Sequence, residues 1–201
     1  MKKFIPALLV ATFIFSGCGG STEEATTTTT EINTEEISTT TGEKETNLGN
    51  DLKGTLINLD KSNQDAFNSL KAVYQAYLIH FETYAKDLDN TENFKKFYEY
   101  TQKNLDYLPT FIRTLSDVSL CLNKAQENYQ KSISKYGEDI VELSNYFLKA
   151  LNGKEIDKNT FSQILNSISN DEIEISSKRK EWLEYEGFEE TEISSILQQN
   201  S

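Results

Sequence analysis

Apolar residues recur every three or four positions from residue 51 onward, and this spacing limits the fold more than any other feature of the chain. The first run contains Leu52, Leu56, Leu59, Ala66, Leu70, Val73, Tyr77, Phe81 and Tyr84. Such a stripe covers one face of an α-helix, whereas a half-buried strand alternates with a period of two. Pro109 is the only proline after residue 50, so little interrupts the pattern. The sequence therefore predicts an all-α domain over residues 51–201.

The ends of the first helix are indicated by breaks in its stripe. We expect it to begin near Leu52 or near Ser62, because Gly54 weakens the first turns, and to end near Leu88. The segment Asp89-Asn90-Thr91-Glu92 resembles a capping box, in which Asp89 caps the next helix and Glu92 follows three residues later.

A second stripe extends from Phe94 to Leu151 and passes Pro109 without a break in phase. Two structures fit this pattern: one very long helix kinked at Pro109, or two helices that meet there with Pro109 in a first turn. We favour the kinked helix, because neither Tyr107 nor Leu108 is a good N-cap residue. Asn152-Gly153 indicates the end of the stripe.

A third helical region begins near Asp157 and ends at Gly187, and a last short helix is expected over residues 192–199. A second capping signal at residues 169–172 suggests a break inside the third region. The connections between the long helices are short, which favours antiparallel neighbours. Together these features predict an elongated antiparallel bundle of three or four long helices behind a disordered N-terminal tether.

The tether is predicted for residues 18–50, where Thr and Glu dominate the composition. After Cys18 its only strongly apolar residues are Ala25, Ile32, Ile37 and Leu48. Such a segment buries too little apolar surface to offset the loss of chain entropy on folding, so we expect it to be disordered.

The first twenty residues have the features of an export signal. Lys2 and Lys3 precede an apolar run that ends at Phe15, and small residues follow it before Cys18. The run is shorter than the roughly 20 apolar residues that a transmembrane helix needs. The segment Phe15-Ser16-Gly17-Cys18 resembles the lipobox of bacterial lipoproteins.

That resemblance implies a signal peptide over residues 1–17, lipidation of the Cys18 thiol, and anchoring of the mature chain to the extracytoplasmic side of a bacterial membrane. Two acyl chains, as the family carries, give stable anchoring where one is marginal. An ordinary secretory signal, in which Cys18 has no role, is the alternative.

Charge and cysteine content narrow the possible partners. The formal net charge is −12, which disfavours binding to nucleic acid and to anionic headgroups. We therefore predict no nucleic-acid partner. With Cys18 lipidated, only Cys121 remains, so no intramolecular disulfide can form. Cys121 lies in an apolar stretch and is expected to be a small buried residue.

Residues that usually carry chemistry are sparse. His80 is the only histidine and stands between Ile79 and Phe81, which indicates a packed residue rather than a zinc ligand. The acidic segment that begins at Asp87 lacks both the glycine and the final glutamate of a calcium-binding loop. We predict no metal, no cofactor and no catalytic residues.

The helix predicted around residues 94–112 has more aromatic residues than one buried face needs. Beside the main stripe, Phe97, Tyr100, Tyr107 and Phe111 form a second line with helical spacing. The plainer interpretation is a central helix that packs on two neighbours. The alternative is an exposed aromatic patch that binds a protein or glycan, because tyrosine is enriched at interfaces.

The sequence thus predicts a non-catalytic surface lipoprotein whose helical domain binds a macromolecule of the cell envelope, in adhesion, in exclusion of phage or conjugating DNA, or in assembly. A sensor or accessory of a membrane enzyme is the second possibility, and a hydrolase or transferase is the third. Nothing in the sequence indicates an oligomeric state.

Overall fold

The computed structural model describes residues 41–153 and 157–199, and all their secondary structure is helical. The helices are α1 (Thr41–Lys86), α2 (Thr91–Leu115), α3 (Lys124–Leu151), α4 (Lys158–Tyr185) and α5 (Glu190–Gln199). The predicted all-α class is confirmed. The predicted signal peptide, Cys18 and the tether up to residue 40 lie outside the described residues.

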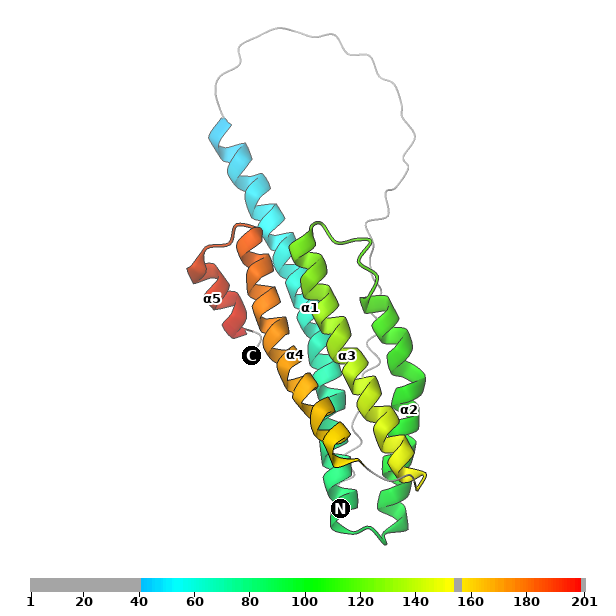
Figure 1. The fold of residues 1–201 in the computed structure, drawn as a ribbon. Helices are drawn as coiled ribbons and strands as arrows, with labels where there is room; N and C mark the ends of the chain where they lie inside the picture. The colour runs from blue at the N-terminus through cyan, green and yellow to red at the C-terminus, as the bar shows by residue number, and fades with distance from the viewer. Residues whose placement is uncertain (1–40, 154–156, 200–201) are drawn as a thin grey trace, which may run out of the picture. The chain divides into compact units, whose positions relative to one another are not determined.

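Helices α1 to α4 run alternately in opposite directions, and α5 folds back beside α4 (Figure 1). Helix α3 packs along both α2 and α4, and α1 packs against α2 and α3. This is the expected antiparallel bundle, with four long helices. The 28 residues of α3 span about 42 Å at 1.5 Å per residue.

The core contains the apolar stripes that the sequence shows, and aromatic rings fill much of it. Tyr129 of α3 stacks on Trp182 of α4, with ring centroids 5.7 Å apart. Close approach of α2 and α3 depends on Gly137, since a Cβ atom there would lie 2.7 Å from Cγ1 of Ile112.

The start of the first helix was predicted too late. Helix α1 begins at Thr41 and not near Leu52 or Ser62, so it covers residues 41–50, which the sequence had assigned to the tether. The expected weakness at Gly54 does not interrupt it, because one exposed glycine costs a helix only about 1 kcal/mol.

The first capping signal is real but shifted by one residue. Asn90, not Asp89, caps α2: its side-chain oxygen accepts hydrogen bonds from the backbone N–H groups of Glu92 and Asn93, each at 3.1 Å. The Asn90 amide in turn donates to the carboxylate of Asp87.

The very long helix kinked at Pro109 is a wrong prediction. Pro109 does lie inside α2, but that helix ends at Leu115 and the chain is non-helical over residues 116–123. Gln130 of α3 stabilises this break, because its side-chain amide donates to the carbonyls of Leu115 and Asp117 at 2.8 and 3.0 Å. Leu120, 79% exposed, lies in the break and not on a buried stripe.

The second capping signal, at residues 169–172, marks no break, because α4 continues through it. Asp171 is buried there and forms an ion pair with Lys135 of α3, so its side chain is used between helices and not as a cap. In the part of the chain that the structure describes, no helix combines the length and the hydropathy needed to cross a membrane.

Candidate binding grooves

A groove with a volume of about 490 Å³ lies between α1 and α4, and Leu197 of α5 reaches its edge. We name it the α1–α4 groove. Its volume is in the range of about 300–1,000 Å³ that is usual for ligand sites. The groove is lined by Gln64, Phe67, Asn68, Lys71, Ile175, Ser176, Arg179 and Leu197.

A buried ion pair joins the two helices that form this groove. Arg179 of α4 donates from Nε and Nη2 to the two carboxylate oxygens of Asp60 of α1, at 2.8 and 2.6 Å. Their side chains are only 6% and 1% exposed. A bidentate pair of this kind fixes both side chains, since guanidinium and carboxylate match in plane and spacing.

Arg179 keeps donors that the pair does not use. A guanidinium carries five N–H groups. The hydrogen bonds within the described residues occupy Nε and Nη2, including a third bond to the backbone carbonyl of Ile196 at 3.3 Å. Among the described residues nothing accepts from Nη1. Because Arg179 lines the groove, a buried side chain there offers two donors to a ligand.

A buried tyrosine supports the same wall. Gln64 of α1 donates from Nε2 to the hydroxyl oxygen of Tyr129 of α3 at 2.6 Å. Burial and the nearby carboxylate of Asp60 raise the pKa of Tyr129. The phenol therefore stays protonated at neutral pH, and it holds Gln64, one of the residues that line the groove.

The opposite end of the groove contains a second, more exposed ion pair. Lys71 of α1 lies 3.3 Å from a carboxylate oxygen of Glu172 of α4, and its ammonium lies 5.7 Å from the ring centre of Phe67. Tyr136 donates to the other oxygen of Glu172 at 3.1 Å, and burial followed by the charge of Glu172 raises the pKa of Tyr136. Glu172 is thus tied to the bundle, whereas Lys71 lines the groove.

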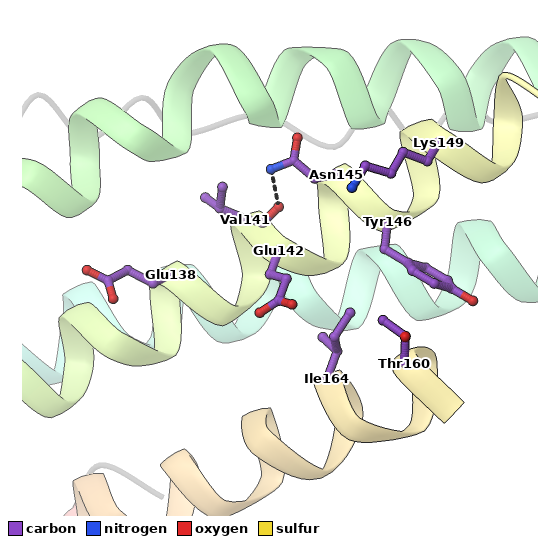
Figure 2. Close-up of a pocket in the computed structure, with 8 residues that line it drawn as sticks. All are labelled: Glu138, Val141, Glu142, Asn145, Tyr146, Lys149, Thr160 and Ile164. Carbon is purple, nitrogen blue, oxygen red and sulfur yellow. Dashed lines mark hydrogen bonds between the residues drawn. The ribbon is translucent and has the colours of Figure 1, made fainter. Parts of the chain in front are cut away.

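A second depression of about 400 Å³ lies on α3 and the first turns of α4. Figure 2 shows Glu142 and Tyr146 of α3 beside Ile164 and Thr160 of α4. Several of its polar groups are already occupied: Asn145 donates to the carbonyl of Val141, and the Tyr146 hydroxyl donates to the carbonyl of Asp157 at 2.9 Å. This surface has fewer donors to offer a ligand than the α1–α4 groove.

A charged cluster also lies between α3 and α4. Lys135 is paired with the buried Asp171 and lies 3.5 Å from Asp139. Burial is the main cause that raises the pKa of Asp171 to about 6, and the neighbouring carboxylate of Asp139 adds to it. Asp171 therefore titrates about two pH units above an ordinary aspartate.

The four predicted patch residues do not form one exposed surface. Phe97 is 1% exposed and packs against Phe147 in the core, so the prediction that it belongs to a surface patch is wrong. Tyr100 is half-buried, and its hydroxyl donates to the carbonyl of Val73 of α1. Only Tyr107, 56% exposed, lies toward solvent, and Phe111, which stacks with it, is half-buried and packs against the core. The plainer interpretation of a helix packed on two neighbours fits the N-terminal half of this line.

The lone histidine and the remaining cysteine are packing residues. The His80 ring lies 4.6 Å from that of Tyr100, and burial together with Lys96 lowers its pKa. Cys121 is half-buried in the 116–123 segment, where its thiol donates to Gln130, and burial raises its pKa. No group of three or more metal-ligating side chains occurs within the described ranges.

Sequence reasoning missed Asp60 and Arg179. The available signal was a charged residue within an apolar stripe: Arg179 stands four residues after Ile175 and three before Trp182. Comparison with protein-family models, with curated proteins and with solved structures finds no match to this chain.

Proposed function

We propose that this chain is a lipid-anchored protein of the bacterial envelope whose helical domain binds a macromolecular partner through the α1–α4 groove. The anchor rests on the lipobox-like residues that end at Cys18. The binding role rests on one observation above all: the buried Arg179 lines the groove, and its Nη1 donors have no acceptor among the described residues.

A preformed groove favours binding, because little side-chain entropy is lost when a partner enters. The ion pair to Asp60 holds the Arg179 side chain, and the hydrogen bond to Tyr129 holds Gln64. Both side chains are positioned before any ligand arrives. The tyrosines around the groove have raised pKa values, so they act as hydrogen-bonding groups and not as general bases.

The anchor is tested by metabolic labelling with an alkyne-bearing palmitate followed by membrane fractionation. The expected result is a labelled, membrane-bound wild type and an unlabelled Cys18→Ser variant that leaves the membrane fraction. Cys121→Ser is the matched control, since it removes the other cysteine and should keep both label and location. Label that survives Cys18→Ser would refute the anchor.

The groove is tested by placing a photo-crosslinking amino acid at Ser176 and, as the control, at Ser177 in intact cells. Ser176 lines the groove, whereas Ser177 is exposed and is not among its lining residues. We expect a discrete crosslinked product from position 176 that is absent from position 177. Equal products from both positions would argue against a specific site.

A further inference from the structure

We propose that the segment of the partner that enters the α1–α4 groove carries a carboxylate beside an apolar side chain, that is, an acidic peptide. This inference rests on the proposed function, because it names the chemistry of the ligand for the same groove. It starts from an asymmetry of charge between the lining of the groove and the rest of the chain.

The described residues that line the groove include two cations, Lys71 and Arg179, and no carboxylate. The chain as a whole has a net charge of −12, so a cationic lining is unusual for it. The two carboxylates that pair with these cations are not among the lining residues: Asp60 is buried, and Glu172 accepts a hydrogen bond from Tyr136. An anionic group that enters the groove therefore contacts the hydrogen-bond donors of Lys71 and Arg179 and no lining carboxylate.

The donors suit a carboxylate. The two N–H groups of Arg179 Nη1 point in fixed directions, because the rest of the guanidinium is bonded to Asp60 and to the Ile196 carbonyl. Charge-assisted hydrogen bonds to a carboxylate are roughly twice as strong as neutral ones. Lys71 can contribute a second contact, because its half-exposed pair with Glu172 is weak and is easily exchanged.

The remaining lining is apolar. Phe67 of α1, Ile175 of α4 and Leu197 of α5 line the groove beside the two cations. They are suited to one apolar side chain next to the ligand carboxylate. An acidic residue adjacent to a large apolar residue satisfies both halves of the groove, whereas a purely charged peptide leaves the apolar half unfilled.

The probe is acetyl-Phe-Glu-Phe-amide, and acetyl-Phe-Gln-Phe-amide is its matched control. Each is titrated into the ¹⁵N-labelled protein carrying Cys18→Ser, so that it is purified without lipid. We expect the Glu peptide to shift the backbone amides of Asn68, Lys71 and Ser176 in a saturable way. We also expect it to bind at least about fivefold more tightly than the Gln peptide, with an advantage that falls as salt screens the charges.

Two variants connect the preference to the groove. The double variant Asp60→Leu/Arg179→Met removes the Nη1 donors while it keeps the core apolar and filled. Circular dichroism checks that it folds, and we expect its preference for the Glu peptide to disappear. Lys71→Gln should reduce the preference severalfold, and Lys61→Gln, which alters an exposed pair with Asp65, should leave it unchanged. Lys71→Gln keeps the proposal testable if the double variant does not fold.

Equal binding of the two peptides by the wild type would overturn the acidic ligand, and so would a Glu preference that persists in Lys71→Gln and in a folded double variant. The proposed function fails by a different result, the loss of a specific crosslink from position 176 in cells. A groove that crosslinks a partner but shows no Glu preference would refute the acidic peptide alone.

Discussion

The buried ion pair between Asp60 and Arg179 provides the sharpest test of this structure. Replacing Asp60 by Asn keeps the volume of the side chain but leaves a guanidinium charge, only 6% exposed, without its carboxylate. Only one of the two hydrogen bonds of 2.8 and 2.6 Å can persist, because an amide side chain has one acceptor oxygen where the carboxylate has two, and Arg179 also keeps its bond to the carbonyl of Ile196. Removing one partner of a buried pair costs about 3–5 kcal/mol.

That cost is large for a domain of this size, whose stability is expected to be about 5–15 kcal/mol. At about 2–4 °C per kcal/mol, the melting temperature of Asp60→Asn should fall by roughly 6–20 °C. Urea denaturation followed by circular dichroism gives the free energy of unfolding directly. The neighbouring Lys61→Ala is the control: it removes an exposed pair with Asp65 that is worth about 0.3–0.5 kcal/mol.

The double variant Asp60→Leu/Arg179→Met is the second comparison, because it removes both charges. With both charges gone, the core loses no paired charge and should be close to wild type in stability. A loss below about 1 kcal/mol in Asp60→Asn would refute the reasoning, because it would mean that water reaches the Arg179 guanidinium and that the pair is not buried.

Three further predictions follow from burial. Gly137→Ala should destabilise by about 1–3 kcal/mol in urea, because the new methyl group meets Ile112, and an unchanged midpoint would contradict the close approach of α2 and α3. Phe97→Ala should cost about 3–5 kcal/mol and Tyr107→Ala less than about 1 kcal/mol in the same assay, so similar losses would contradict their different burial. The pKa of Asp171 is raised to about 6, so the folded state binds the proton of this carboxyl more tightly than the unfolded state does. The protonated carboxyl therefore stabilises the folded state below about pH 4, and this stabilisation is lost as the pH rises through 6. The melting temperature of Asp171→Asn relative to wild type should therefore rise between pH 4.5 and pH 7, and a flat difference would refute the shift.

Some helices and helix ends could be predicted from the sequence, and others could not. The 3.6-residue period from Leu56 to Tyr77 predicts α1, because burial of one face follows directly from the local order of residues. The helix end before Asn152-Gly153 and the start of the next helix near Asp157 are local in the same sense, and both are where the sequence puts them. In contrast, the capping signal at residues 169–172 is overridden, because Lys135 of another helix pairs with Asp171.

The candidate groove depends on contacts that no local pattern contains. Asp60 and Arg179 are separated by 119 positions in the chain, and only the packing of α1 beside α4 brings them together. The same applies to the break at residues 116–123, which an apolar stripe concealed and which Gln130 stabilises from α3.

The sequence by itself therefore determined the all-α class, the amphipathic stripes and the resemblance to a lipoprotein signal, because each depends on neighbours within a few residues. The tertiary structure decided which charges are buried, which aromatic rings reach solvent and where a groove opens. The physical reason is that burial is a property of the surface between helices, and the free energy of a charge or a ring depends on what covers it.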